Sequence, residues 1–162
     1  MNKLNLVELL FGEDNFDYTK SDVKDFVVKL TDLKRTRLFI ETWHYSGSVN
    51  GLRISQIFGL FYQGNLIGAM IYGPLGMPNI WKKYAKAERK VIELKRLCCI
   101  DNTPKNTESY FIGKTLRWLK QNTDYDLVVS YADTFYGHSG VIYKASNFKH
   151  VGMTTKGKVI DY

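Results

Sequence analysis

The segment between residues 91 and 133 constrains the fold more than any other part of this chain. Residues 91–100 (VIELKRLCCI) and 126–133 (DLVVSYAD) are short apolar runs typical of buried strands, and residues 110–122 (YFIGKTLRWLKQN) between them predict a helix. Two strands joined through a helix pair in parallel, so their carboxyl ends lie at one edge of the sheet. Because ligands of such sheets usually bind in the crevice at that edge, we expect the functional site in the polar loops that follow the strands.

The rest of the chain predicts a mixed sheet with helices on both faces, an α/β (α+β) fold. Residues 23–43 predict one or two helices, and residues 44–53 (HYSGSVNGLR) a loop. Two β-rich runs follow, separated by Gly64 and Asn65, a two-residue hairpin signal. After the βαβ unit come a helix-like stretch near residues 139–146 and a strand-like tail.

No repeat or interdomain linker interrupts this order, so we expect residues 1–162 to form a single domain. The order resembles the GNAT acyltransferase fold. In that fold two parallel central strands splay apart, and the gap between them admits an acyl-CoA.

Composition indicates a folded protein with a basic surface. The 162 residues are 44% hydrophobic and 14% aromatic, which argues against a disordered chain. The net charge is +7, and the basic residues are spread along the sequence. They form either an ordinary solvated surface or a surface for an anionic partner such as nucleic acid. The 11 Tyr, 9 Phe and 3 Trp favour nucleic acid, because aromatic side chains stack on unpaired bases.

The two cysteines, Cys98 and Cys99, are adjacent in an apolar strand. Neighbouring side chains of a strand point to opposite faces, so we expect no disulfide between them. This usage is typical of a reduced, intracellular protein. No signal peptide opens the chain and no apolar run approaches the length of a membrane span. We therefore expect a soluble cytoplasmic protein with no membrane partner.

Arg96 is the residue for which the sequence gives the strongest argument for a functional role. Regular alternation places it on an otherwise apolar face of its strand. The other residues of that face are Ile92, Leu94, Cys98 and Ile100. A guanidinium there needs an anionic partner or several acceptors, since an unpaired buried charge is costly. Arg96 therefore forms an internal ion pair, with Asp133 as one candidate partner, or it is buried at the site and holds a substrate or cofactor.

The loop DNTPKNTES leads into the predicted helix of the βαβ unit. A helix N-terminus offers backbone N–H groups and the positive end of the helix dipole, which suits a phosphate. The residues expected to bind a cofactor there are Asn106, Thr107, Ser109, Gly113 and Lys114. The alternative is an ordinary Asn or Thr cap on a surface helix. The sequence lacks the Gln or Arg followed by Gly-x-Gly or Gly-x-Ala that usually binds the pyrophosphate in GNAT proteins.

Two polar segments carry most of the other groups that act on protons or bind ligands. Ser130 and Asp133 lie at the end of the second parallel strand, where catalytic carboxylates of α/β proteins often lie. His44, Tyr45 and Ser46 open a loop, where they can serve as base, stacking platform and hydrogen-bond donor. The alternatives are a structural hydrogen bond for His44 and a helix cap for Asp133. The sequence contains no HxH, HxxxH or CxxC spacing of the kind that metal sites use, so it assigns neither a metal nor its ligands.

Four motifs together resemble the phage Mom family of DNA-modifying proteins. They are WHYSG near residue 44, ELKRL around residue 96, PKNTES before the helix, and SYAD followed by GHSGVIYKASNFKHVG. The similarity covers roughly residues 39–152. It implies a GNAT-like fold and a phage or prophage enzyme in the host cytoplasm. Such an enzyme converts adenine in DNA to N6-(methylcarbamoyl)adenine, which protects the DNA from restriction enzymes.

The resemblance also implies a set of site residues. Matched by motif, the catalytic candidates are His44, Tyr45, Arg96, Ser130 and Asp133, with Ser109 as a further active-site candidate. The substrate is an adenine flipped out of double-stranded DNA. The residues expected to bind it are Ser46, Tyr131, Phe135, Tyr136 and His138. Acyl-CoA and iron both stay open as cofactors.

Two other functions fit the same sequence. One is a GNAT-type N-acyltransferase that uses acyl-CoA on a small amine or a protein. The other is a non-catalytic protein that binds nucleic acid or a host factor through its basic face. The DNA-modifying function makes a geometric prediction, namely that His44, Tyr45, Ser130 and Asp133 converge on one cleft near the carboxyl ends of the parallel strands.

Overall fold

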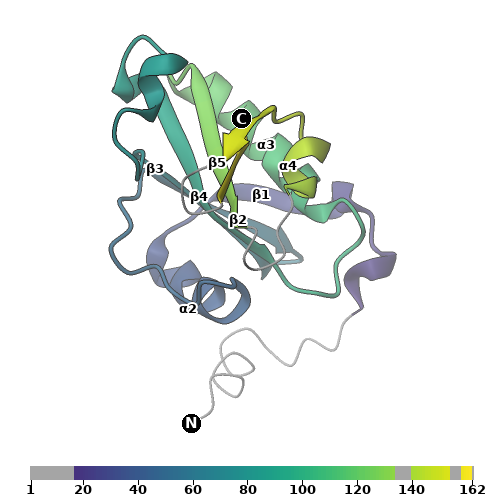
Figure 1. The fold of residues 1–162 in the computed structure, drawn as a ribbon. Coiled ribbons are helices and arrows are strands. Elements are labelled where there is room, and N and C mark those ends of the chain that lie inside the picture. Colours follow the sequence, from purple (N-terminus) through teal and green to yellow (C-terminus); the bar gives the residue numbers. More distant parts are fainter. Residues whose placement is uncertain (1–16, 134–139, 154–157, 162) are drawn as a thin grey trace.

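The centre of the protein is a seven-stranded sheet with the order β1-β2-β3-β4-β5-β7-β6 (Figure 1). The computed structural model describes residues 17–133, 140–153 and 158–161. Neighbouring strands are antiparallel except β4 and β5, which are parallel. The strands are β1 (Val27–Leu30), β2 (Gln56–Tyr62), β3 (Asn65–Gly73), β4 (Val91–Cys99), β5 (Leu127–Asp133), β6 (His150–Met153) and β7 (Lys158–Asp161). The predicted mixed sheet and βαβ unit are confirmed.

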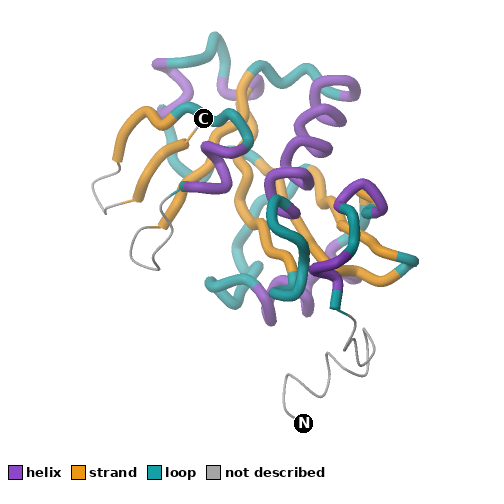
Figure 2. The backbone as a smooth tube through the Cα atoms, turned by 90° about the vertical axis from the view of Figure 1, so that its right-hand side faces the viewer, coloured by secondary structure: helices purple, strands orange, loops and turns teal. Residues whose placement is uncertain are grey.

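Helices cover both faces of this sheet (Figure 1, Figure 2). Ala69 and Ile71 of β3 pack in one apolar cluster with α2, whereas Met70 and Tyr72 of the same strand pack in another with α3. Because neighbouring residues of a strand point to opposite faces, α2 and α3 lie on opposite sides of the sheet. The α-helices are α2 (Leu33–Trp43), α3 (Thr107–Asn122) and α4 (Val141–Ala145). The 3-10 turns are η1 (Tyr18–Lys20), η2 (Val23–Asp25), η3 (Ile80–Lys83) and η4 (Glu88–Lys90). Within the described ranges, no helix combines the length and the apolar character needed to cross a bilayer.

Strand β1 replaces part of the helical region predicted over residues 23–43. The β-branched Val27 and Val28 pair with β2, and this long-range pairing overrides the local helical pattern. The helix α2 begins only afterwards. Its start is set by Asp32, whose carboxylate accepts a hydrogen bond from the backbone N–H of Arg35 at 2.9 Å.

The predicted hairpin and the predicted strand at the end of the chain both differ in detail from the structure. The β2–β3 turn is formed by Gln63 and Gly64, one residue earlier than predicted, because Asn65 already pairs with Tyr62. Gln63 and Gly64 have φ angles of 47° and 84°, and such positive values at both positions are typical of a two-residue hairpin turn. The strand-like tail forms two antiparallel strands, β6 and β7, of which β7 pairs with β5.

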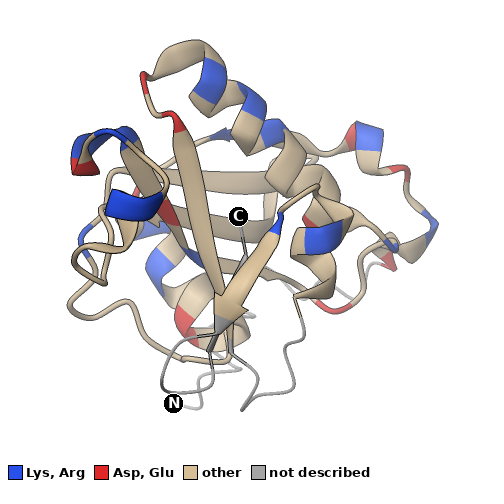
Figure 3. Cartoon of the chain, turned by 45° about the horizontal axis from the view of Figure 1, so that its top comes forward, with Lys and Arg blue, Asp and Glu red and all other residues tan. Residues whose placement is uncertain are grey.

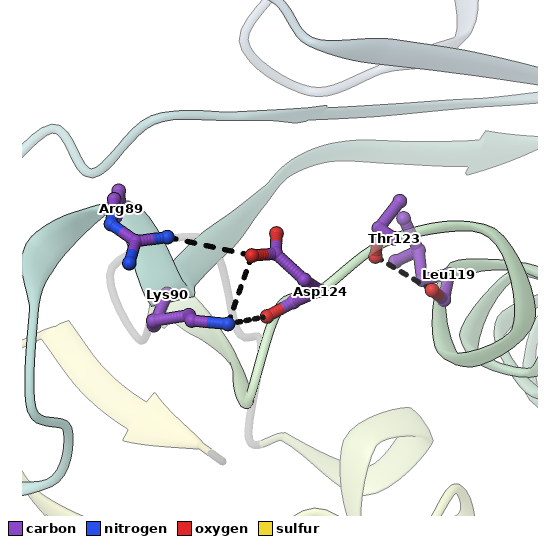
Figure 4. Close-up of polar contacts among 5 residues, drawn as sticks. All are labelled: Arg89, Lys90, Leu119, Thr123 and Asp124. Carbon is purple, nitrogen blue, oxygen red and sulfur yellow. Dashed lines mark hydrogen bonds and ion pairs between the residues drawn. The ribbon is translucent and has the colours of Figure 1, made fainter.

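A small polar cluster ties the two ends of the βαβ crossover together (Figure 4). The Lys90 Nζ lies 2.9 Å from Asp124 Oδ2 and donates to the carbonyl oxygen of Asp124 at 2.8 Å. Arg89 lies 3.4 Å from the same carboxylate. The hydrogen bond from Lys90 lowers the pKa of Asp124, but an exposed pair of this kind adds little to stability. Its effect is positional, because it holds the start of β5 beside the start of β4, where the Asp126 N–H donates to the Lys90 carbonyl at 2.8 Å.

A β-bulge divides β4 into two halves. Ile71 of β3 pairs with Arg96, but the next residue, Tyr72, pairs with Leu94, so Lys95 is an extra residue on β4. One extra residue shifts the alternation of side chains by one position. Side chains beyond the bulge therefore lie on the face opposite to the one that regular alternation predicts.

Strands β4 and β5 separate at this bulge. Their last parallel pair joins Leu94 to Ser130, and beyond Ser130 the residues of β5 pair with β7 alone. Strand β4 continues to pair with β3 as far as Cys99. The two parallel strands thus form a fork that opens toward their carboxyl ends, and this fork is the part of the fold that positions the site.

The first prediction compares two glycines. A Cβ at Gly73, the last residue of β3, would overlap the backbone of Arg53. We expect Gly73→Ala to displace the loop before Arg53 and to lower the free energy of unfolding by about 1–3 kcal/mol. In helix α3, a Cβ at Gly113 would meet the Arg117 side chain at an ordinary 3.8 Å. Gly113→Ala should therefore raise the free energy of unfolding by about 0.5–1 kcal/mol. Urea denaturation measures both changes, and equal stability of the two variants would contradict this packing.

Candidate functional site at the fork

A cavity of about 240 Å³ opens at the fork between β4 and β5. Its walls come from the loop after α2, the loop after β3, both sides of the β4 bulge, and β5. The lining residues are Tyr45, Gly76, Met77, Glu93, Leu94, Lys95, Arg96 and Tyr131. The structure therefore brings together Tyr45, Arg96 and Tyr131, which lie far apart in the sequence and were all expected at the site.

Arg96 lines this cavity from a different face than predicted. Regular alternation placed it on one face with both Leu94 and Cys98, but the bulge separates these two. Leu94 packs toward α3, whereas Arg96 and Cys98 lie on the side of α2. The side chain is half-buried. Its Nε donates to the carbonyl of Ser48 at 3.2 Å, and its Nη1 donates to the carbonyl of Lys95 at 2.8 Å. The bond to Ser48 fastens the loop of residues 44–53 to β4.

The start of that loop is ordered by His44, which ends α2 and is only 7% exposed. The His44 N–H donates to the carbonyl of Ile40 at 2.9 Å. The backbone N–H of Ser46 donates to His44 Nδ1 at 3.1 Å, and the Ser46 hydroxyl lies 2.8 Å from the same atom. Because a backbone N–H can only donate, Nδ1 is an acceptor, and we assign the ring proton to Nε2. In this tautomer His44 presents a hydrogen-bond donor, not a base, at Nε2.

Tyr45 connects His44 with the cavity. The rings of His44 and Tyr45 lie 4.3 Å apart between centroids and are tilted by 32°. Tyr45 is 44% exposed although it lines the cavity. One face of its ring is thus supported by the imidazole while the side chain stays accessible to a ligand.

Ser130 lies at the fork itself and is completely buried. Its hydroxyl donates to the carbonyl of Leu94 at 3.3 Å and bridges the last parallel pair. The backbone of Asp133 pairs with Lys158 of β7. The side chain of Asp133 and the residues Phe135, Tyr136 and His138 lie outside the described part of the structure. The convergence of Asp133 with His44 therefore stays a prediction.

Glu93 and Lys95 are the site residues that sequence reasoning missed. Lys95 Nζ lies 3.9 Å from Glu93 Oε2, and the two side chains are only 6% and 13% exposed. Glu93 Oε2 also accepts a hydrogen bond from the backbone N–H of Gly76 at 2.7 Å. The available signal was the E-x-K spacing, because two charged residues at i and i+2 of an apolar strand share one face.

Burial shifts the pKa values of Lys95 and Tyr131, two residues that line the cavity. It lowers the pKa of Lys95, and the nearby Glu93 carboxylate partly opposes this effect. Burial, assisted by Glu93, raises the pKa of Tyr131 to about 12, so its phenol stays protonated at neutral pH and can donate a hydrogen bond. Arg53 and Arg96 add positive charge next to Lys95. One carboxylate therefore faces several cations, which suits a ligand that carries negative charge or develops it.

The first turn of α3, predicted to bind a cofactor phosphate, is occupied by its own hydrogen bonds. The Thr107 hydroxyl donates to the carbonyl of Pro104 at 2.6 Å, and the Ser109 hydroxyl donates to that of Asn106 at 3.1 Å. Glu108 adds negative charge to the same turn. These two hydroxyls already donate within the turn, so a pyrophosphate bound here would rely on the backbone N–H groups at the start of α3. Of the other residues predicted there, Gly113 lies within α3, and Lys114 Nζ lies 5.4 Å from the centre of the Tyr110 ring.

The described residues contain no group of three or more His, Cys, Asp or Glu side chains that could hold a metal ion. The two cysteines are free thiols, as predicted, and pack in different apolar clusters. Burial raises the pKa of Cys98 to about 12 and raises that of Cys99 as well. Both thiols are therefore protonated at neutral pH, and a protonated thiol is a poor nucleophile.

A mixed sheet whose parallel pair forks at a bulge, with helices on both faces, defines the chain as a protein of the GNAT acyltransferase fold. An N-acetyltransferase from Staphylococcus aureus Mu50 superposes with a TM-score of 0.60 and 16% identity, over 84% of this chain and 96% of that one. A Bacillus subtilis acetyltransferase solved in complex with CoA gives a TM-score of 0.60 and 8% identity over the same shares.

Within this fold, residues 25–160 match the Mom protein family, and the chain belongs to that family. The methylcarbamoylase Mom of Escherichia phage Mu is 32% identical over 135 residues, which are 80% of this chain and 54% of that protein. The chain thus spans about half the length of this curated relative. The family membership and the GNAT-like fold expected from the sequence motifs are confirmed.

The second prediction tests the pair of Glu93 and Lys95. Glu93→Gln removes the carboxylate that opposes the lowering of the Lys95 pKa, so this pKa should fall further. At pH values between the lowered pKa of Lys95 in the folded protein and the usual lysine pKa of about 10.4, the unfolded chain binds more protons than the folded one. The free energy of unfolding therefore rises with pH over this interval. The rise should begin at a lower pH in the variant. Urea unfolding between about pH 7 and about pH 10 measures it, and identical profiles would mean that the two groups do not interact.

Proposed function

We propose that the protein is a phage DNA-modifying transferase that adds a methylcarbamoyl-type group to the N6 amine of adenine and so protects the DNA from restriction. Membership of the Mom family and the name of the phage Mu relative support this reaction. The observation that carries the proposal is the cavity at the fork, which collects Tyr45, Arg96 and Tyr131 from three separate segments. The protein acts on DNA in the cytoplasm of the host cell.

The groups in this cavity suit transfer to an amine. The reaction forms a C–N bond at N6 and breaks the bond between the transferred group and its carrier, which leaves with the electron pair of that bond. One N–H proton is released at N6, so the site needs a proton acceptor, and the Glu93 carboxylate is one. Negative charge develops on the oxygen of the transferred carbonyl group. Lys95, Arg96 and the protonated phenol of Tyr131 line the same cavity and can stabilise that charge.

The cavity also offers a place for an adenine beside these groups. A base inside a duplex is inaccessible, so the target nucleotide is extruded into the site. Tyr45 and Tyr131 line the cavity from different segments and offer aromatic surfaces on which the base can stack. His44 supports the Tyr45 ring, and Ser46 holds the His44 ring. Asp133, at the end of β5, remains a candidate catalytic residue from the family motif. Ser130 is buried, donates to the Leu94 carbonyl and does not line the cavity, so its role is to hold the fork.

A GNAT-type N-acyltransferase for a small amine or a protein is the second candidate. The fold favours it, and the Bacillus subtilis acetyltransferase of this fold binds CoA. The first turn of α3 gives it little side-chain support, because the Thr107 and Ser109 hydroxyls donate within the turn and Glu108 is acidic. The donor of the transferred group is left open between acyl-CoA and another carrier, with iron as a further candidate cofactor.

The third prediction concerns Arg96. We expect Arg96→Ala to abolish adenine modification, because it removes the guanidinium from the cavity and the bond that holds the 44–53 loop. Arg96→Lys should not restore activity, since an ammonium lacks the planar fork of donors. Arg117→Ala, an exposed change on α3, is the control and should modify DNA normally. Mass spectrometry of nucleosides from cells expressing each protein measures the modified adenine.

Two results of this experiment would contradict the proposal. If the wild-type protein leaves adenine unmodified in cells and acetylates a small amine with acetyl-CoA, the second candidate is correct. If a folded Arg96→Ala variant modifies DNA at the wild-type level, the site does not lie at the fork. Circular dichroism of the variant separates a loss of activity from a loss of folding.

A further inference from the structure

The connection between β3 and β4, whose residues Gly76 and Met77 line the cavity, also carries exposed lysines. Lys82, Lys83 and Lys86 are all exposed, and we call these three residues the lysine cluster. None of them forms an ion pair with a carboxylate of the described residues. Lys83 Nζ lies 5.5 Å from the ring centre of Tyr84, which is itself 38% exposed. The connection thus offers positive charge and an aromatic ring to the solvent.

The polypeptide under the lysine cluster is firmly anchored. Ile80, Trp81 and Ala85 pack against the apolar cluster of Leu75, Val91 and Val129, and Tyr131 packs against the same cluster. Tyr131 also lines the cavity. The segment that carries the lysines thus packs on the same apolar cluster as Tyr131, a residue that lines the cavity.

Two side chains hold the beginning of the connection at the mouth of the cavity. Arg53 Nη2 donates to the carbonyl of Leu75 at 2.6 Å, and Glu93 accepts from the N–H of Gly76 at 2.7 Å. Gly76 and Met77 line the cavity themselves. The end of the connection is held by the contacts of Arg89 and Lys90 with Asp124. Because both ends are fixed, the lysine cluster keeps its place relative to the site.

Lys and Arg residues are spread over several helices and loops of the protein (Figure 3), and two pairs of them lie on helices away from the site residues. Arg117 and Lys120 lie on α3, which covers the opposite face of the sheet from α2 and the 44–53 loop. Lys34 and Arg37 lie in the first turns of α2, whereas the site residues follow its last turn. At 1.5 Å per residue, ten residues of helix separate Lys34 from the site end by about 15 Å.

We propose that the lysine cluster binds the phosphate backbone of DNA next to the extruded base. This inference rests on the proposed function and names the surface that holds its substrate. Phosphates are regularly spaced anions without sequence information, and exposed lysines that lack carboxylate partners are suited to them. A base that enters the cavity leaves its flanking phosphates outside it, and the connection that carries the lysine cluster borders the cavity through Gly76 and Met77. The contacts position the strand and do not select its sequence.

The fourth prediction compares two triple variants with the same change of charge. The first is Lys82→Gln/Lys83→Gln/Lys86→Gln. The matched control is Arg117→Gln/Lys120→Gln/Lys144→Gln, with all three residues exposed on α3 and α4. Affinity for a duplex of mixed sequence is measured from low to high salt. In the first variant, the magnitude of the slope of log affinity against log salt should decrease by about 3, because each phosphate contact releases about one counterion. The affinity of this variant at low salt should decrease by about tenfold or more. The control should change both quantities much less.

The outcomes separate this inference from the proposed function. Equal losses in the two variants, or a larger loss in the control, would show that the lysine cluster is not the DNA surface. Nucleoside mass spectrometry of the wild-type protein would then still show modified adenine, so the proposed function would stand. If the wild-type protein neither binds DNA at low salt nor modifies it, the proposed function fails, and this inference fails with it. Thermal unfolding of both variants confirms that the exposed changes leave the fold intact.

Discussion

One extra residue in β4 determines the architecture of the candidate site. In a regular strand, side chains at successive positions point to opposite faces, so Lys95 and Arg96 would be on different sides of the sheet. The bulge at Lys95 removes this restriction and places Glu93, Lys95 and Arg96 together at one cavity. It also ends the parallel ladder at Leu94, which lets β4 and β5 diverge. The fork, the cavity and the concentration of charge at one place therefore have a single geometric origin.

Local periodicity was enough to predict the core of the fold. The apolar runs that became β4 and β5 and the helical pattern that became α3 lie where the sequence placed them, since strand and helix periods are local properties. Strand β1 was mistaken for helix because Val27 and Val28 adopt a strand only through pairing with distant β2. The bulge was also not predictable. The residues around Lys95 include no Gly or other turn residue, so the register shift appears only when β4 pairs with β3.

The candidate site was predictable to the extent that its residues stand out individually. Tyr45, Arg96 and Tyr131 were expected and share the cavity, whereas Glu93 and Lys95 were overlooked within the same short motif. Their importance comes from burial beside each other, and burial of a charge is a property of the tertiary structure. The face of Arg96 was wrong for the same reason, because it depends on a register shift. The family motifs located the segments, and the bulge decided how their side chains meet.

The protonation of the two native thiols has a practical consequence for following this protein in solution. The chain contains two cysteines, and burial raises the pKa of both. Maleimide and related dyes react with thiolates, so Cys98 and Cys99 should remain largely unlabelled at neutral pH. A cysteine introduced at an exposed position, such as Lys24→Cys near the start of β1, would then accept a fluorophore selectively in an otherwise native chain. The protein is thus suited to single-site labelling without a cysteine-free background, and the proposed binding of DNA can be tested by anisotropy in real time.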